Sequence, residues 1–123
     1  MTAGAARRRP PLVYEVRRGE PDRLTCRLQV PTDAEALRGH FPGRPIVPGM
    51  MLVSWAADIA ARYFDLGRFA GMTTGKFRRP LRPGEIVELD LEWQAGPCRL
   101  RYIYGVGGVE CARGTLEFRR DIV

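Results

Sequence analysis

Apolar and polar residues alternate with a period of two in several stretches of the chain, a pattern typical of strands with one buried face. The first such stretch is residues 23–30, and residues 12–18 are expected to form a short strand before it, across the turn-forming residues 19–22. The later ones are residues 87–94, 99–104 and 109–118, and sheet is expected to resume at residue 76. Acidic residues in 87–94 and arginines in 99–104 favour an antiparallel hairpin with oppositely charged pairs across it.

Residues 49–64 follow a helical pattern instead. Apolar side chains cover most of the circumference, which predicts a helix with apolar surroundings on nearly all sides. The polar residues Ser54, Asp58 and Arg62 are spaced four apart and form one narrow stripe. Gly67 follows, where a helix commonly ends. The element order predicts an α+β fold with a strongly curved antiparallel sheet wrapped around one long central helix.

Length and composition bound the class of protein. The chain has 123 residues, which suits one domain over residues 12–123 after a flexible basic tail at residues 1–11. No apolar stretch approaches the ~20 residues that a membrane-spanning helix needs. The N-terminus lacks the apolar segment of a signal peptide, so a cytoplasmic location is expected.

The net charge and the numbers of cysteines and histidines limit which binding partners and cofactors are expected. The net charge of +6 favours an acidic partner, and no recognition motif accompanies it that would indicate nucleic acid. Three scattered cysteines and one histidine argue against a disulfide framework and a metal site. No metal or organic cofactor is therefore expected.

The segment that carries candidate catalytic residues is the proline-rich loop at residues 31–49, which contains the sole histidine, His40. An imidazole can accept a proton near neutral pH. The first turn of the following helix has free backbone N–H groups, and Gly49 has no side chain to obstruct an approaching carbonyl. A base beside such an amide suits proton abstraction next to a thioester carbonyl. A buried structural histidine in a stiff loop is the alternative interpretation.

Two runs of residues resemble a known family. Residues 40–49 read His-Phe-Pro-Gly-Arg-Pro-Ile-Val-Pro-Gly and lead into the apolar helix. This run resembles the signature of the β-hydroxyacyl-acyl carrier protein dehydratases. Residues 76–85, Lys-Phe-Arg-Arg-Pro-Leu-Arg-Pro-Gly-Glu, are similar to the strand and turn that follow the helix in that family. The resemblance implies a hotdog fold, a dimer, and dehydration of (3R)-3-hydroxyacyl to trans-2-enoyl groups in fatty acid or polyketide and polyene biosynthesis.

The resemblance also implies roles for individual residues. His40 would remove the C2 proton, the Gly49 amide would polarise the thioester carbonyl, and the loop backbone near Ile46 would orient the imidazole ring. The substrate-lining residues implied are Phe41, Ile46, Met50, Ser54 and Trp55, with a position in the core as the alternative for Trp55. The substrate would arrive on acyl carrier protein, an acidic partner that suits the basic group Arg78, Arg79 and Arg82.

The chain departs from the family pattern at Ser54. The family has Glu or Asp there, fourteen residues after the histidine, to protonate the leaving hydroxyl across a dimer interface. A serine hydroxyl is too weak an acid to replace it directly. Asp58, one turn further on, could supply the acid unless an Arg62 pair holds it.

Ser54 is also consistent with a chain that does not act as a dehydratase on its own. A heterodimer with a second hotdog subunit could supply the carboxylate, or the chain could be a non-catalytic partner subunit. An acyl thioesterase on the same fold is a further alternative. Chain length, pathway and the choice between homodimer, heterodimer and higher oligomer do not follow from the residues.

Overall fold

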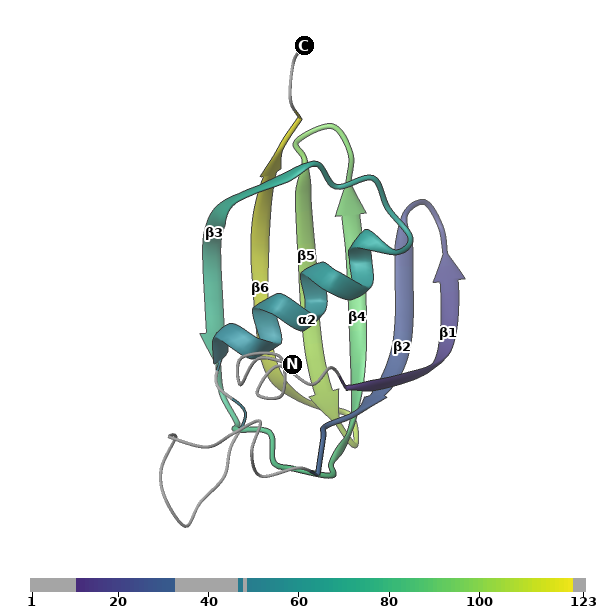
Figure 1. Cartoon of the computed structure of the whole chain (residues 1–123), viewed down its shortest axis with the longest axis vertical. Helices are drawn as coiled ribbons and strands as arrows, with labels where there is room; N and C mark the ends of the chain where they lie inside the picture. Colours follow the sequence, from purple (N-terminus) through teal and green to yellow (C-terminus); the bar gives the residue numbers. More distant parts are fainter. Residues whose placement is uncertain (1–10, 33–46, 48, 121–123) are drawn as a thin grey trace, which may run out of the picture.

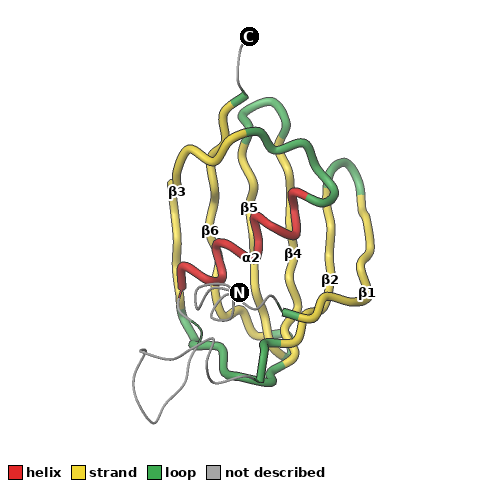
Figure 2. The backbone as a smooth tube through the Cα atoms, viewed as in Figure 1, coloured by secondary structure: helices red, strands yellow, loops and turns green. Residues whose placement is uncertain are grey.

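The structure is a computed structural model that describes residues 11–32, 47 and 49–120. Within them, six strands form one antiparallel sheet that curves around a helix, as Figures 1 and 2 show. The strands are β1 (Leu12–Gly19), β2 (Arg23–Gln29), β3 (Arg68–Phe77), β4 (Ile86–Gln94), β5 (Arg99–Val106) and β6 (Val109–Arg119), and the helix is α2 (Gly49–Ala61). The sheet order β1-β2-β4-β5-β6-β3 leaves β1 and β3 at its edges. This α+β arrangement, with a curved antiparallel sheet against one helix, is the one that the element order predicted.

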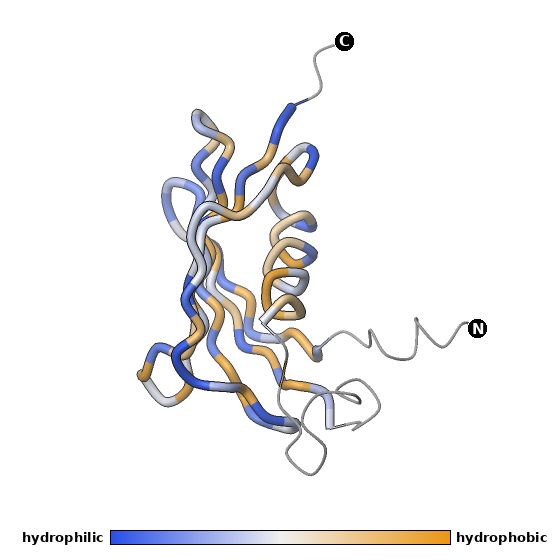
Figure 3. Tube along the Cα trace, turned by 90° about the vertical axis from the view of Figure 1, so that its left-hand side faces the viewer, coloured by the Kyte–Doolittle hydropathy of each residue, from blue (hydrophilic) through white to orange (hydrophobic). Residues whose placement is uncertain are grey.

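The concave face of the sheet forms the core because its strands alternate as predicted. In β2, β4 and β5, every second side chain is buried. These buried residues are Leu24, Cys26, Leu28, Val87, Leu89, Leu91, Trp93, Leu100, Tyr102 and Tyr104. Figure 3 shows α2 against this side of the sheet. The opposite, convex face carries the polar residues of the alternation.

The helix α2 crosses the concave face diagonally, beginning near the end of β3 (Figure 1). Its inward residues Leu52, Val53, Trp55, Ala56, Ile59 and Ala60 are buried. The predicted polar stripe of Ser54, Asp58 and Arg62 is exposed, which confirms its outward orientation. The rest of α2 agrees with the predicted apolar surroundings, because outside this stripe only Met50 and Ala61 are exposed.

The helix ends three residues before the predicted Phe64. Beyond Ala61, the N–H of Arg62 bonds to Ile59 and that of Tyr63 to Ala60, at 3.1 and 3.0 Å. This three-residue spacing is the tighter turn that often closes a helix. Gly67 has a positive φ of 87°, and a Cβ there would lie 2.6 Å from the Arg119 carbonyl oxygen. That glycine therefore serves the close approach to β6.

The strand β3 starts at Arg68, eight residues before sheet was expected to resume. Its pairing with β6 shifts register between Phe69 and Gly71 and again between Met72 and Thr74. Each irregularity resets which side chains face the core. A period-two pattern is consequently absent from the sequence of this strand.

Candidate functional site

Part of the predicted site lies outside the described residues: His40, Phe41 and Ile46 belong to residues 33–46. The chain is described again at Val47, which is buried and donates its N–H to the carbonyl oxygen of Leu81 at 2.8 Å. Leu81 is itself fully buried. This hydrogen bond anchors the chain directly before α2 begins, at the end of the helix where the predicted chemistry would take place.

Gly49 is the first residue of α2. The first N–H groups of a helix have no acceptor within the helix, and the helix dipole makes this end electropositive. A Cβ on Gly49 would lie 3.0 Å from ring carbons of Phe77, at the end of β3. The glycine thus allows a carbonyl to approach the amide and also allows the Phe77 ring to pack on the helix start.

Ser54 and Asp58 share the exposed outer stripe of α2. Asp58 and Arg62, both described, form no ion pair with each other, so the pairing weighed as an alternative role for Asp58 is not formed. The described residues leave the Asp58 side chain exposed. For Asp58 to act as an enclosed acid, a group from elsewhere would therefore have to cover it.

Met50 and Trp55, both predicted to line the substrate, have different environments. Met50 is 64% exposed on the first turn of α2, whereas Trp55 is 5% exposed in the core. Within the described residues, Trp55 packs among core side chains. Met50 is free to contact a ligand or another subunit at the helix start.

An apolar strip follows the concave side of β3, and sequence reasoning missed it. Its members are Phe69, Met72 and Phe77, together with Met50, and all are 43–64% exposed. Phe77 faces Gly49, and Phe69 packs edge-on against Phe118 with ring centroids 5.8 Å apart. Exposed apolar surface of this extent marks an interaction or ligand site. The register shifts of β3 removed the alternation that would have revealed the strip.

The basic group predicted to meet an acidic partner is partly used within the chain. Arg79 makes a two-pronged ion pair with Glu85, with nitrogen–oxygen distances of 3.1 and 2.6 Å. Glu85 also accepts the backbone N–H of Arg82 at 2.7 Å. Arg79 therefore closes the turn before β4, while the guanidinium of Arg82 makes no ion pair with the described residues.

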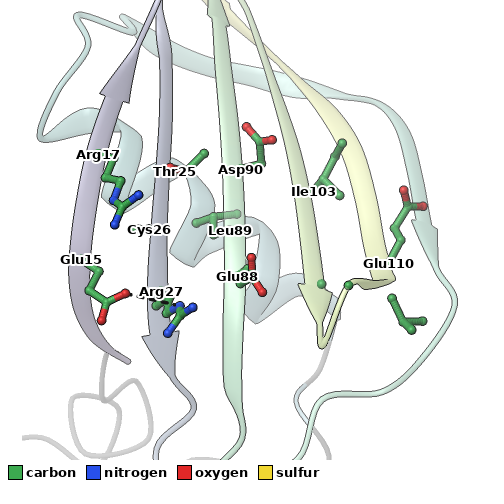
Figure 4. A pocket seen from close by; sticks show the side chains of 13 residues that line it. Glu15, Arg17, Thr25, Cys26, Arg27, Glu88, Leu89, Asp90, Ile103 and Glu110 are labelled. Carbon is green, nitrogen blue, oxygen red and sulfur yellow. Dashed lines mark ion pairs between the residues drawn. The ribbon is translucent and has the colours of Figure 1, made fainter.

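A hollow of about 370 Å³ lies on the convex face, with α2 behind the sheet (Figure 4). Glu88 of β4 pairs with Gly105 of β5. Because this glycine has no side chain, it leaves space for the hollow. Charged side chains surround it, and Arg27 pairs with Glu15 at 3.4 Å. The hollow is on the opposite face from the predicted site and contains none of its residues.

Two kinds of site were also sought among the described residues. No cluster of three or more histidine, cysteine or acidic side chains there has metal-binding geometry. No helix in residues 11–32, 47 and 49–120 has the length and apolar character needed to cross a membrane.

Solved structures with the same architecture place the chain among hotdog proteins. The dehydratase heterocomplex ApeI:P from Xenorhabdus doucetiae superposes with a TM-score of 0.81 at 23% identity, covering 89% of this chain and 97% of that one. An uncharacterized protein from Erwinia carotovora subsp. atroseptica gives a TM-score of 0.75 at 27% identity, with coverages of 89% and 95%. The fold is therefore the hotdog fold.

Sequence comparison identifies the family. Residues 16–115 match the ApeI-like family, described as ApeI dehydratase, and the chain belongs to it. The 3-hydroxyacyl-[acyl-carrier-protein] dehydratase FabZ of Ruminiclostridium cellulolyticum is 30% identical over 119 residues, which is 87% of this chain and 84% of that protein. FabZ of Acetivibrio thermocellus is 34% identical over 92 residues, which is 66% of this chain and 63% of that protein. The match to two other FabZ proteins spans 45% and 61% of their length.

Proposed function

We propose that this chain dehydrates (3R)-3-hydroxyacyl groups on acyl carrier protein to trans-2-enoyl groups. Membership of the ApeI-like dehydratase family is the observation that carries this proposal. The glycine at the start of α2 and the apolar strip beside it support the proposal, because a thioester carbonyl and an acyl chain would need such neighbours.

In the proposed reaction, His40 takes the C2 proton while the N–H of Gly49 donates a hydrogen bond to the thioester oxygen. The electron pair of the C2–H bond forms the C2–C3 double bond, and the C3–O bond breaks. The hydroxyl leaves as water after receiving a proton. An amide positioned where charge develops lowers the barrier to the first step.

Phe41, Ile46 and Met50 are proposed neighbours of the acyl group, and Trp55 is proposed as a core residue behind it.

The proton for the leaving hydroxyl needs a carboxylic acid, and two sources remain. Asp58 is on the same outer stripe as Ser54, one turn further along α2, about 6 Å along the helix axis. Alternatively, a second hotdog subunit supplies a carboxylate. Both stripe residues are exposed in this chain, so a subunit that covers α2 would enclose either arrangement.

A partner subunit has a suitable surface at β3. This strand is an edge of the sheet, with backbone groups available for pairing, and the apolar strip follows its concave side. We propose that a homodimer or a heterodimer with another hotdog subunit buries this edge. The similar structure from Xenorhabdus doucetiae is a dehydratase heterocomplex, which supports the proposal of a heterodimer.

Acyl carrier protein is the proposed carrier of the substrate. The net charge of +6 and the exposed Arg82 guanidinium would attract an acidic surface. No cofactor takes part, because proton transfer and carbonyl polarisation suffice for the reaction.

Ser54 favours one alternative, in which the chain is a half-site or non-catalytic subunit of a heterodimeric dehydratase. Hydration of enoyl thioesters by the purified chain, with and without a candidate partner subunit, separates these functions. Activity of the chain alone supports the dehydratase with Asp58 as acid. An inert wild type that gains activity in Ser54→Glu supports the partner-subunit function. Release of free thiol from acyl thioesters would instead identify a thioesterase.

A further inference from the structure

Two glycines are paired between the edge strand β3 and its neighbour β6. Gly114 of β6 pairs with Gly75 of β3 and, on its other side, with Tyr102 of β5. A Cβ on Gly114 would lie 2.5 Å from the Tyr102 hydroxyl oxygen, and a Cβ on Gly75 would lie 3.0 Å from the Met72 sulfur. The Tyr102 phenol and the Met72 thioether therefore occupy the space that the two missing side chains leave.

The hydroxyl of Tyr102 has no hydrogen-bond partner among the described residues, although the side chain is fully buried. Tyr104 is two residues further along the same strand face, and its hydroxyl donates to the Leu52 carbonyl oxygen at 2.6 Å. Burying an unbonded hydroxyl is unfavourable. Phenylalanine would fill the same space without this penalty. The Tyr102 hydroxyl thus indicates a hydrogen-bonding group that the described residues do not provide.

The position of Tyr102 relates it to the proposed acyl path. Phe77, which faces Gly49, belongs to the row of paired residues that includes Ala112 and Tyr104. The row with Tyr102 is two residues further along the strands, a distance of about 7 Å. An acyl chain whose carbonyl is bound at Gly49 would pass this row several bonds beyond its thioester.

Met72 is the side chain that lies over Gly75, with its sulfur 3.0 Å from where a Cβ on that glycine would be. It is 43% exposed and belongs to the apolar strip. A thioether on an unbranched chain changes conformation readily. Movement of Met72 would open the space over Gly75 toward the buried phenol of Tyr102.

We propose that the Tyr102 hydroxyl selects acyl chains that carry an oxygen function several bonds from the thioester, with Met72 covering it in their absence. This inference rests on the proposed function, because the apolar strip must hold the acyl chain. A purely hydrocarbon chain leaves the hydroxyl unpaired, whereas a hydroxyl or carbonyl oxygen on the chain satisfies it. A site built around such a buried polar group discriminates against ligands that lack its partner.

The test compares two pantetheine amides that are not turned over, one acylated with octanoate and one with 7-hydroxyoctanoate. Calorimetric titration of the full chain measures both affinities. The wild type is expected to bind the hydroxylated amide about tenfold more tightly, a typical effect of one buried hydrogen bond. Tyr102→Phe is expected to bind both amides equally, with unchanged affinity for the octanoyl amide.

Tyr104→Phe is the matched control and should keep the preference, because its hydroxyl already bonds to Leu52. Equal binding of the two amides by wild type, or a preference that persists in Tyr102→Phe, overturns the inference. Absence of binding by either amide also overturns it. Enoyl hydration by the same preparation then tells whether the proposed function fails too, because that assay uses short unsubstituted chains.

Discussion

Tyr104 of β5 donates a hydrogen bond to the carbonyl oxygen of Leu52 in α2, at 2.6 Å. Both residues are buried, so the bond joins the helix to the sheet through the core. Burial raises the pKa of the Tyr104 hydroxyl well above its ordinary value, which keeps it protonated as a donor. Tyr102 has the same chemistry without the partner.

This contrast predicts opposite stability effects for the same substitution. Tyr104→Phe should lower the free energy of unfolding by about 1–2 kcal/mol, because it removes a buried hydrogen bond. Tyr102→Phe should leave that free energy unchanged or raise it, because no bond is lost. Urea unfolding of both variants measures the difference. A larger loss in Tyr102→Phe than in Tyr104→Phe would show that the Tyr102 hydroxyl has a partner within the folded chain.

Gly49→Ala tests whether the helix start is shaped for a carbonyl or for the Phe77 ring. The new Cβ would press on that ring at 3.0 Å and also crowd the amide. We expect the rate of enoyl hydration to fall about tenfold or more, as for loss of an oxyanion donor. The double variant Gly49→Ala with Phe77→Leu relieves the ring contact. Restored activity in the double variant would assign the glycine to packing instead.

Gly114→Ala should be among the most destabilising single substitutions in the sheet. Its Cβ would meet the Tyr102 ring at 2.6 Å and the Thr74 carbonyl oxygen at 2.7 Å. Overpacking of this kind costs about 1–3 kcal/mol. Gly96→Ala is the matched control, since a Cβ there has no neighbour within 4 Å. Equal melting temperatures for the two variants would contradict the packing described for Tyr102.

The Arg79–Glu85 pair predicts a pH dependence of stability. Arg79 holds the pKa of Glu85 below its ordinary value of 4.5, chiefly by hydrogen bonding. A carboxyl with a lowered pKa in the folded state stabilises above pH 4.5, and the contribution is lost as the pH falls below it. Glu85→Gln should therefore lose stability at neutral pH and show a weaker dependence in acid. The matched control is Glu88→Gln, which removes an exposed carboxylate without an ion pair among the described residues and should leave stability at neutral pH within about 0.5 kcal/mol of the wild type in urea unfolding.

The sequence was sufficient to predict the fold because its core obeys simple periodicities. Alternation in β2, β4 and β5 and the apolar helix defined the two layers, and the outward stripe of Ser54 and Asp58 followed from helical spacing. The strand β3 was missed because its register shifts break the alternation. The apolar strip was missed with it.

The site was predictable to a smaller degree. The position of Gly49 at the helix start follows from the motif, whereas the 64% exposure of Met50 was not predicted, because the sequence indicated a helix buried on most sides. Periodicity indicates that Tyr102 is buried, but the fate of its hydroxyl depends on Gly114 and Met72, which approach only through cross-strand pairing. The roles of His40, Phe41 and Ile46 remain predictions from the motif, outside the described residues.

The central claim is that the His40 imidazole removes a proton beside a thioester carbonyl. The most direct measurement is the rate of reversible hydration of a crotonyl thioester by wild type and His40→Ala, with any required partner subunit present in both samples. Loss of a general base predicts a fall of about 100-fold or more in the variant. A His40→Ala rate equal to that of wild type would contradict the account.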